Sequence, residues 1–448
     1  MTPEYDLAVI GSGAAAFAAA IAASDLSKRV VIAESNQVGG TCVNVGCIPS
    51  KALLASAESL DLSAMVDSKN RLVDQMRSDK YVDLARAYGF EILRGRAEFL
   101  DSESIVVADE QITAAAYLVA SGASPSVPPI EGLREAGYLT STSALEVRTP
   151  PKELAVIGAN AVGLELGQLF LKLGSKVTFL EAMPRIAPLE ELEVSALMRS
   201  VLEEEGASVL TGVKIDSVRR AGDRRTISVD HRDGRQQISV DEVLVATGRQ
   251  PNTAGMGLDK AGIGLTDRGA IDVDEHLRTS NPRVWAAGDV TGHPQFVYVA
   301  AYEGNLAARN ALVNADLKVD FTAMPRVIFT TPTVAAAGLT DGEANAQGIR
   351  CECRVLPLSA LPRALVNRDT RGFVKIVAER SSGRILGATA VAHGAGDVIQ
   401  AAVYAIKFGL TTDQVAETWS PYLTFAEGFK LAAQTFKRDV SKLSCCAA

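Results

Sequence analysis

Four of the six cysteines of this 448-residue chain form two close pairs, one near each end of the sequence. Cys42 and Cys47 are separated by four residues in the segment GGTCVNVGCIPSK, and Cys445 and Cys446 are adjacent in SKLSCCAA. In a reducing compartment, paired cysteines usually carry redox chemistry or bind metal ions rather than cross-link the fold. We therefore expect both pairs to be functional.

The composition is that of an ordinary globular protein, with 47% hydrophobic and 22% charged residues and a net charge of −8. This charge, without a dense Lys/Arg run, argues against nucleic-acid binding. The apolar run Ala14–Ala23 is too short and too rich in alanine to span a bilayer, and it follows a strand and a glycine turn, unlike a signal peptide. We expect two or three domains, a cytoplasmic location and no membrane partner.

The two pairs must be positioned by the rest of the chain, which begins with a nucleotide-binding pattern. Residues 5–10 form a short apolar strand that leads through Gly11 and Gly13 into an alanine-rich helix, a dinucleotide fingerprint in which Ala16 takes the third glycine place. Gly11 permits the tight turn, and Gly13 lets a pyrophosphate approach the helix N-terminus. Glu34 ends the second strand, where it can accept hydrogen bonds from a ribose. The site is expected to include Gly11, Gly13, Ala14, Ala15 and Glu34.

The same pattern recurs in the middle of the chain. A second strand leads into Gly158 and Gly163, and the next strand ends at Glu181, which follows Gly158 by 23 residues (181 − 158), just as Glu34 follows Gly11 by 23 (34 − 11). One fingerprint is a weak signal, but two copies with matching acids disfavour two ordinary strand-to-helix turns. Asn160 stands where the middle glycine is expected, so a second cofactor would approach less closely.

Each fingerprint is followed by a strand that ends in a small-residue turn, at Gly122 and at Gly248, and a third apolar strand ends at Asp289. Ligands bind at the carboxyl ends of the strands in such sheets, so an aspartate there is a candidate ligand contact; the alternative is an ordinary turn residue. We predict an α/β fold with two Rossmann-like domains and a C-terminal α+β domain. The expected boundaries are 1–150 with a return segment 271–319, 151–270, and 320–448.

This arrangement resembles the flavoprotein disulfide reductase family (the pyridine nucleotide-disulfide oxidoreductases), and the resemblance covers essentially the whole chain. It implies FAD on the first fingerprint, a nicotinamide nucleotide on the second, and a C-terminal dimerisation domain. The further cofactor contacts that it implies are Gly40, Thr41, Lys51 and Val297.

The double-cysteine segment is the most specific motif of that family. The resemblance implies that Cys47 lies against the flavin, that Cys42 is the exchange cysteine, and that Lys51 pairs with Glu165. The residues fit this chemistry, because a thiolate becomes reactive at a helix N-terminus beside a cation. Glycines 39 and 40 would let the backbone press against a flat cofactor. Pro49 and the glycines argue against the alternative of two buried structural cysteines.

A proton shuttle is missing from the C-terminal domain. Disulfide reductases usually carry a histidine five residues before a glutamate, whereas here Tyr422 precedes Glu427 in SPYLTFAEG. A phenol with an ordinary pKa of about 10 is a poor base at neutral pH. No histidine is expected near this segment; the four are His231, His276, His293 and His393. A substrate that needs thiolates but no exchange base, such as a soft metal ion, would fit.

The segments CVNVGCIPSK, PQFVYVAA, PYLTFAEG and the terminal LSCC are similar to the mercuric reductases within that family. The resemblance implies a homodimer with active sites at the subunit interface. The Cys445–Cys446 tail of one subunit would deliver Hg(II), including thiol-bound Hg(II), to Cys42 and Cys47 of the other, where it is reduced to elemental mercury. All four thiols would be metal ligands. Two tyrosines that assist in that family correspond to Tyr81 and Tyr422.

Some features leave alternatives open. The family mostly uses NADPH, but Glu181 would repel a 2′-phosphate, and Arg185 softens this only in part, so we expect NADH to be used better than is usual. Cys351 and Cys353 alternate on one face of an expected strand and form either an auxiliary metal site or an incidental pair. The competing functions are a dihydrolipoamide dehydrogenase-like or thioredoxin reductase-like disulfide reductase and a thiol-rich metal buffer. The missing histidine argues against the first, and the intact redox segment argues against the second.

Overall fold

The computed structural model describes residues 3–56, 61–232, 234–439 and 442, and these divide into two compact units. Unit 1 comprises residues up to 128, residues 140–149 and residues 247–319, and unit 2 comprises residues 129–139, 150–246 and those from 320 on. In the part of the chain described here, every helix falls short of the length and apolar character that crossing a membrane requires.

Unit 1 is built on a seven-stranded sheet in the order β3-β2-β1-β6-β5-β4, with β17 also paired to β6. The strands β1, β2, β3, β6 and β17 run parallel, so their carboxyl ends meet at one edge, where ligands bind in such sheets. The strand bounds are β1 Tyr5–Ile10, β2 Val30–Glu34, β3 Glu91–Arg94, β4 Ala97–Phe99, β5 Ser104–Val107, β6 Glu110–Val119 and β17 Val284–Ala286.

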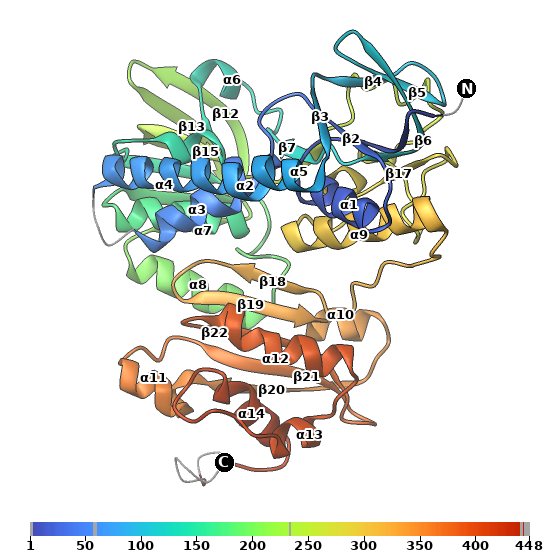
Figure 1. Cartoon of the computed structure of the whole chain (residues 1–448). Helices are drawn as coiled ribbons and strands as arrows, with labels where there is room; N and C mark the ends of the chain where they lie inside the picture. The colour runs from blue at the N-terminus through green and yellow to red at the C-terminus, as the bar shows by residue number, and fades with distance from the viewer. Residues whose placement is uncertain (1–2, 57–60, 233, 440–441, 443–448) are drawn as a thin grey trace. The chain divides into compact units, whose positions relative to one another are not determined.

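Helix α1 (Ala14–Asp25) packs along α9 (Val297–Val313), and Figure 1 shows the two side by side. The approach is close because both helices present small residues: a methyl group on Gly304 of α9 would lie 2.0 Å from the backbone oxygen of Ala15. Ala16, Ala19 and Ala20 are fully buried. The alanine-rich stretch is therefore a packing surface inside the unit.

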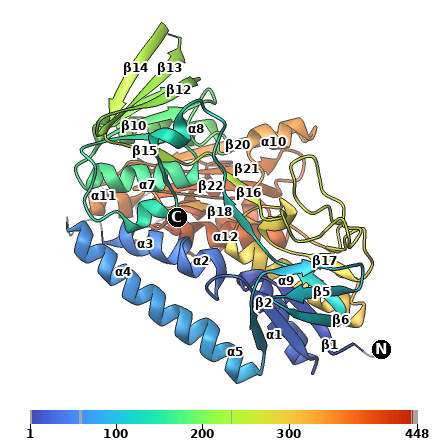
Figure 2. The same cartoon turned by 90° about the horizontal axis from the view of Figure 1, so that it is seen from above.

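The double-cysteine segment forms two short helices, α2 (Gly40–Asn44) and α3 (Cys47–Ala55). A long helical rod packs beside them, made of α4 (Leu62–Arg77), the π-helical turn η2 (Ser78–Val82) and α5 (Asp83–Tyr88), and Figure 2 shows it as one continuous element. Asp61 caps α4 by accepting a hydrogen bond from the Ala64 backbone at 3.0 Å. Helix α4 packs against both α2 and α3.

Unit 2 contains the second nucleotide-type sheet, in the order β11-β10-β9-β15-β8, beside a three-stranded sheet β12-β13-β14 (Figure 2). Helices α7 (Ala161–Lys172) and α8 (Leu192–Glu204) accompany the larger sheet. The strand bounds are β8 Leu139–Thr140, β9 Glu153–Ile157, β10 Lys176–Glu181, β11 Ser208–Thr211, β12 Lys214–Ala221, β13 Arg224–His231, β14 Gly234–Val240 and β15 Glu242–Val245.

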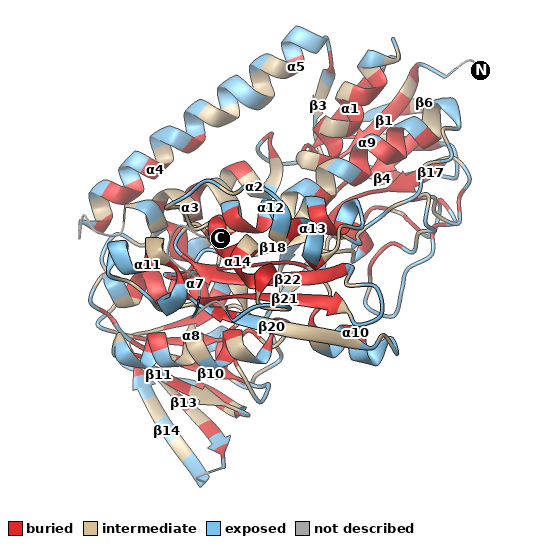
Figure 3. Cartoon of the chain, turned by 90° about the horizontal axis from the view of Figure 1, so that it is seen from below, coloured by how far each residue is buried: buried red, intermediate tan, exposed pale blue. Residues whose placement is uncertain are grey.

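The C-terminal part of unit 2 is an antiparallel sheet in the order β18-β19-β22-β21-β20 with five short to medium helices. Figure 3 shows β21 and β22 as the buried centre and β20 as a partly exposed edge strand. The bounds are β18 Pro325–Ile328, β19 Thr333–Gly338, β20 Cys351–Pro357, β21 Phe373–Glu379, β22 Ile385–Ala392, α10 Asp341–Ala346, α11 Pro362–Asn367, α12 Ala395–Lys407, α13 Thr412–Glu417 and α14 Glu427–Gln434. This is the α+β domain expected from the sequence.

One boundary differs from the sequence prediction. Residues 247–270, assigned from the sequence to the second nucleotide domain, cluster with unit 1. The strand β16 (Arg249–Pro251) pairs with β7 (Ala123–Pro125), and Met256 and Leu258 are buried with Phe99 in the unit 1 core. The chain therefore returns to the first domain near residue 247 and not at 271, because the apolar residues of 247–270 pack in the core of unit 1.

A buried ionic cluster joins the nucleotide-type part of unit 2 to its C-terminal sheet. The ammonium of Lys375 on β21, 1% exposed, lies 3.0 Å from Glu191, 2.9 Å from Glu193 and 2.8 Å from Asp341. Burial opposes the charge of Lys375, but the hydrogen bonds that its ammonium donates to the three carboxylates outweigh this effect and raise the pKa of the lysine above its ordinary value. Glu191 is only 2% exposed and depends on this lysine for charge compensation.

We expect Lys375→Ala to lower the free energy of unfolding by about 3–5 kcal/mol, because it leaves the Glu191 carboxylate buried without a cation. Denaturant unfolding of the cofactor-loaded protein measures the change. The matched control is Lys407→Ala, which removes an exposed partner of Asp320 at 2.6 Å and should change stability little. Equal effects of the two substitutions would contradict a structural role for the cluster.

Candidate active site

The first glycine turn forms a cradle at the carboxyl end of β1. Gly11 has a φ of +104°, and a methyl group there would lie 2.4 Å from the Ala120 oxygen, so only glycine fits. The carboxylate of Glu34 is 8% exposed and accepts hydrogen bonds from Ser12 Oγ at 2.5 Å and from the Asn36 backbone at 2.6 Å. The N-terminus of α1 and a fixed carboxylate thus face the same edge, as a dinucleotide requires.

Gly39 and Gly40 pack closely against neighbouring parts of unit 1, and their expected contact with a flat cofactor stays a prediction. A methyl group on Gly40, at φ +62°, would lie 2.6 Å from the Gly13 Cα, and one on Gly39 would lie 2.4 Å from a Val43 methyl group. These glycines let the redox segment pack against the glycine turn and within itself. The Ser12 hydroxyl joins the two parts, because it also accepts a hydrogen bond from the Gly39 backbone at 3.1 Å.

The remaining residues expected at the first cofactor lie at the same edge of unit 1. Asp289 begins a short 3-10 turn after β17 and pairs with Arg249 at 3.5 Å. Burial raises the pKa of Asp289, and Arg249 acts in the opposite direction. Gly122, with a φ of +68°, faces open space, and Val297 is the first residue of α9. The glycine cradle, the held carboxylate and this open space fit a flavin dinucleotide.

The two redox cysteines lie on consecutive helices, not on one helix. Cys42 is in the middle of α2, and Cys47 is the first residue of α3. Gly46 allows the chain to break between the two helices. A residue with a side chain would not fit at this position, because its methyl group would lie 2.8 Å from the Thr41 oxygen. Asn44 fixes α2 by donating to the Gly40 oxygen at 2.9 Å and the Val38 oxygen at 3.0 Å. The first turn of α3 favours negative charge on Cys47.

A hydrogen bond links the Cys42 and Cys47 thiols. The pKa of the Cys42 thiol is raised far above its ordinary value, first by the hydrogen bond to Cys47, then by burial, while Lys51 acts in the opposite direction. A hydrogen bond between the thiols keeps the proton on Cys42 and is consistent with negative charge on the Cys47 side. Neither cysteine is in a disulfide in this structure.

Tyr81 lies beside the cysteine pair. It belongs to the π-helical turn η2, its ring is edge-on to Phe17 at 4.8 Å, and it lies 3.4 Å from the position of a Gly39 side chain. Burial, and then the charges of Cys42 and Cys47, raise the pKa of Tyr81, so its hydroxyl stays protonated. A single π-turn inside a long helix often marks a functional position.

The second cradle lies in unit 2 and repeats the design of the first. Gly158 has a φ of +96°, and a methyl group on Gly163 would lie 1.9 Å from its oxygen. Asn160 is the residue before α7, with no side-chain hydrogen bond to the helix. Glu181, 7% exposed, accepts hydrogen bonds from the Ala159 backbone at 2.7 Å and the Met183 backbone at 2.8 Å.

The Arg185 guanidinium, which was expected to offset part of the Glu181 charge, is engaged by other partners. Its guanidinium donates to the Pro188 oxygen at 2.6 Å, the Ala187 oxygen at 3.2 Å and the Ser195 hydroxyl at 2.6 Å. These contacts fix the loop after β10. Because these contacts engage the Arg185 guanidinium, Glu181 is the charged residue that a nucleotide ribose would meet in this unit.

Tyr422 is 52% exposed in the loop before α14, and Glu427 begins that helix. Glu427 is 5% exposed, burial raises its pKa, and one of its carboxyl oxygens has no hydrogen-bond partner. The expectation that no histidine lies near this loop is wrong. The His393 ring is 6.1 Å from the Phe425 ring, and both line a cavity of about 320 Å³ with Asp369 and Arg371. His393 directly follows the last residue of β22, and this strand ends on the side of the domain where the Phe425 loop lies.

Two expectations about this site stay predictions. Lys51 belongs to unit 1 and Glu165 to unit 2, so their pairing stays a prediction; within unit 2, Glu165 accepts a hydrogen bond from the Phe329 backbone at 2.9 Å. Cys445 and Cys446 lie outside the described residues. Thr41 lies 3.5 Å from Arg249, and Gly248, which faces open space at φ +99°, belongs to unit 1.

Sequence reasoning missed three contributors to this site: Ser12, Asn44 and Arg249. Ser12 occupies the variable place of the glycine fingerprint, and Asn44 lies between the cysteines, so each carried a positional signal. Arg249 follows Gly248 in the strand-and-turn segment VATGRQPN, but its pairing with Asp289 joins segments 40 residues apart in sequence (289 − 249).

Two dinucleotide-type cradles, a redox cysteine pair and a C-terminal α+β domain define a class of flavoprotein. A family model described as "Pyridine nucleotide-disulphide oxidoreductase" matches residues 5–304, and a model of the dimerisation domain of the same family matches residues 324–433. The chain belongs to the pyridine nucleotide-disulphide oxidoreductase family, which is FAD-dependent and uses a pyridine nucleotide. The predicted fold class and family are confirmed.

Within that family the chain is similar to mercuric reductases. It is 50% identical to the mercuric reductase of Streptomyces lividans, covering 99% of this chain and 98% of the relative, and 46% identical to that of Staphylococcus aureus, covering 99% and 84%. Among solved structures, the Cu(II) complex of the HOCl-induced flavoprotein disulfide reductase RclA from Escherichia coli matches with a TM-score of 0.91 and 29% identity, over 98% of this chain and 100% of that one.

The shared proton of the cysteine pair predicts opposite responses to two substitutions. Cys47→Ala removes the main cause of the raised Cys42 pKa, so the thiolate of Cys42 should form at lower pH than in the parent. Lys51→Met removes a cause that lowers this pKa, so the thiolate should form at higher pH. The pH dependence of the initial rate of Cys42 alkylation by iodoacetamide in the reduced protein, followed by peptide mass mapping, measures both. Shifts in the same direction would refute the hydrogen-bonded pair.

Proposed function

We propose that this protein is a mercury(II) reductase that converts Hg(II) to elemental mercury with NAD(P)H, in the balance NAD(P)H + Hg²⁺ → NAD(P)⁺ + H⁺ + Hg⁰. The observation that carries the proposal is a redox dithiol accompanied by a tyrosine where a disulfide reductase has its histidine base, in a chain similar to mercuric reductases over its full length. Bound FAD supplies the electron pair that it accepts from the nicotinamide.

The residues of this chain bind and neutralise the ion. Hg(II) is a soft ion that prefers thiolates, so its binding displaces the proton held on Cys42 and uses the negative charge favoured on Cys47. The negative charge favoured on Cys47 at the start of α3 and the Lys51 charge near Cys42 make the first thiolate accessible. Tyr81 keeps its proton and offers a hydroxyl beside the sulfurs, so it positions the dithiol and excludes water. No group of this site has to act as a base for disulfide exchange.

The terminal cysteines have a delivery role in this proposal. Cys445 and Cys446 of one subunit collect Hg(II) from thiol carriers and pass it to Cys42 and Cys47 of the partner. Thiolates hold the ion at each step, so capture from dilute solution becomes a transfer between neighbouring sites. Tyr422, which is half exposed in its loop, assists the same transfer.

Delivery between subunits requires a homodimer. The C-terminal part of the chain matches the dimerisation domain of the family. It also exposes large aromatic side chains, with Trp419 at 98%, Phe408 at 73% and Tyr404 at 57%. Exposed aromatic residues of this size gather at protein interfaces, so a second copy of the chain is the occupant we infer for them. A reaction that consumes NAD(P)H fits a cytoplasmic location.

The disulfide reductases remain the main alternative, because His393 lies near the Tyr422 loop. Two arguments favour Hg(II). The His393 ring faces Phe425 and a cavity with Asp369 and Arg371, whereas the position five residues before Glu427 is Tyr422. The relatives with the highest identities reported above are mercuric reductases.

The tail is tested by changing both terminal cysteines to alanine. We expect the Cys445→Ala/Cys446→Ala variant to lose Hg(II) reduction by on the order of 100-fold when a monothiol is in large excess, because the carrier thiol then competes with the active-site pair. Mercury vapour release and NAD(P)H oxidation are followed together. Reduction of a dye that takes electrons directly from the flavin is the control and should not change. Undiminished vapour release would contradict the delivery role.

The nucleotide preference depends on Glu181. Its carboxylate would repel the 2′-phosphate of NADPH and accept a hydrogen bond from the ribose of NADH. We expect kcat/KM to favour NADH more than is usual in the family, and Glu181→Gln to raise the NADPH/NADH ratio of kcat/KM by about 10-fold, roughly 1.4 kcal/mol. The amide can keep one of the two backbone hydrogen bonds that the carboxylate accepts. An unchanged ratio would contradict this assignment.

A further inference from the structure

The one cysteine pair that the proposed reaction does not use lies on the edge strand β20. Cys351 and Cys353 are two residues apart, so their side chains project from the same face of the strand. The Cys353 thiol approaches the Cys351 sulfur at 3.9 Å, and the Cys351 sulfur lies 3.7 Å from Asn345 Oδ1 on α10. Both cysteines are partly buried and neither is in a disulfide.

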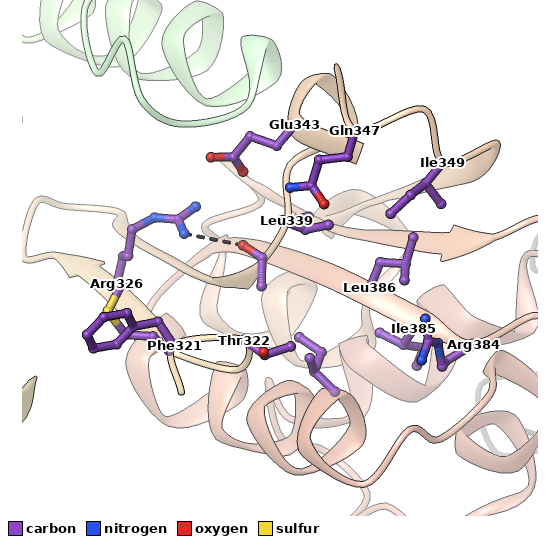
Figure 4. A pocket seen from close by; sticks show the side chains of 13 residues that line it. Phe321, Thr322, Arg326, Leu339, Glu343, Gln347, Ile349, Arg384, Ile385 and Leu386 are labelled. Atoms are coloured by element: carbon purple, nitrogen blue, oxygen red, sulfur yellow. Dashed lines mark hydrogen bonds between the residues drawn. The ribbon is translucent and has the colours of Figure 1, made fainter. Parts of the chain in front are cut away.

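The pair lies over an apolar surface. Ala344, Val377 and Leu386 are buried beneath it, and Leu339 and Ile349 pack around it. Leu339, Ile349 and Leu386 also line a cavity of about 480 Å³, which Figure 4 shows with Glu343 and Gln347 of the α10 region at its upper side. The thiols therefore pack on an apolar surface on one side, and the charges of Lys375 and Asp341 act on Cys353.

The sulfur separation fits one ion held by two thiolates. With metal–sulfur bonds of about 2.3 Å, two sulfurs 3.9 Å apart subtend an angle of roughly 116° at the ion. A linear arrangement needs about 4.6 Å, a further opening of about 0.7 Å that side-chain rotation can supply. The two sulfurs are thus close enough to bind one ion together after a small side-chain rotation.

A disulfide fits less well. Residues i and i+2 of a strand have Cα atoms about 6.6–6.8 Å apart, at the upper end of the range for disulfides. An ion between the sulfurs relieves this constraint, because it adds two bonds to the bridge. Burial, and then the charge of Cys351, raise the pKa of the Cys353 thiol to about 12, while Lys375 acts in the opposite direction.

The ligand count selects the kind of ion. Among the residues that the structure describes, no group of three or more His, Cys, Asp or Glu side chains is arranged to hold a metal. Zinc in structural sites takes four ligands, so it is poorly served here. Soft ions that accept two thiolates fit, and a divalent one leaves the site neutral, since two displaced protons balance its charge. A monovalent soft ion would leave the two-thiolate site with a net negative charge.

We propose that Cys351 and Cys353 form a second binding site for a soft, two-coordinate divalent cation, Hg(II), separate from the redox pair. Binding follows 2 RSH + Hg²⁺ → Hg(SR)₂ + 2 H⁺, with two S–H bonds broken, two S–Hg bonds formed and no change of oxidation state. The site holds the ion without passing electrons to it. It belongs to unit 2, whereas Cys42 and Cys47 belong to unit 1.

The test uses the full chain with the other four cysteines changed to serine, so that Cys351 and Cys353 are the only thiols left. HgCl₂ is added in the presence of excess 2-mercaptoethanol and bound mercury is measured, and in a separate titration with HgCl₂ alone thiolate–mercury absorbance and proton release are measured. We expect one Hg(II) per chain and two protons per ion. Further Cys351→Ser or Cys353→Ser substitution should weaken binding by on the order of 100-fold, because each removes the chelate. Glu352→Gln, on the opposite face of the strand, is the control and should bind normally.

A second measurement does not depend on the folding of the four-serine variant. In the otherwise unchanged protein, Cys351→Ser/Cys353→Ser should lower the mercury bound per chain by one and leave the rate of Hg(II) reduction unchanged. Unchanged stoichiometry, equal binding by the single-serine variants, or a Cys351–Cys353 disulfide in the purified protein would overturn the proposal. The binding measurements involve no turnover, so their failure would leave the proposed reaction standing.

Discussion

The hydrogen bond between the Cys42 and Cys47 thiols is the interaction on which the rest of the site depends. It sets the charge of the pair. The raised pKa of Cys42 keeps the proton on Cys42, and negative charge is favoured on Cys47, the first residue of α3. It also requires the two short helices to meet, and the break at Gly46 allows this. A soft ion replaces the shared proton with two sulfur bonds, so the geometry that holds the proton also prepares the metal site.

Close backbone packing keeps this pair next to the first nucleotide cradle. Gly40 packs against Gly13, and the Ser12 hydroxyl joins the Gly39 backbone to the Glu34 carboxylate. The second cradle is built alike, with Glu181 held by the Ala159 backbone in the place that Ser12 takes in the first. In both cradles the acid also accepts a hydrogen bond from the backbone two residues further on. One local design thus recurs in two nucleotide-type cradles, and within unit 1 the dithiol segment packs against the first.

Much of this could be predicted from the sequence. The glycine turns, the acids that follow them, the C-terminal strands and helices and the shared face of Cys351 and Cys353 all follow from local pattern. Contacts between residues that are distant in the sequence could not be predicted from local patterns. The end of the second nucleotide region near 247 depends on Met256 and Leu258 finding their core in unit 1, and His393 approaches Phe425 only because β22 carries it there. The Lys375 cluster joins residues 184 positions apart.

The most direct test of the account is a single turnover without oxygen. The protein is reduced with one equivalent of NADH, mixed with one equivalent of Hg(II), and elemental mercury and residual reduced flavin are measured, in the parent and in Cys42→Ala and Cys47→Ala variants that bind FAD fully. If electrons reach the ion through bound thiolates, the parent releases one mercury atom per NADH oxidised, whereas both variants keep their flavin reduced and release almost none. Mercury release by either variant at the parent's rate would contradict the account.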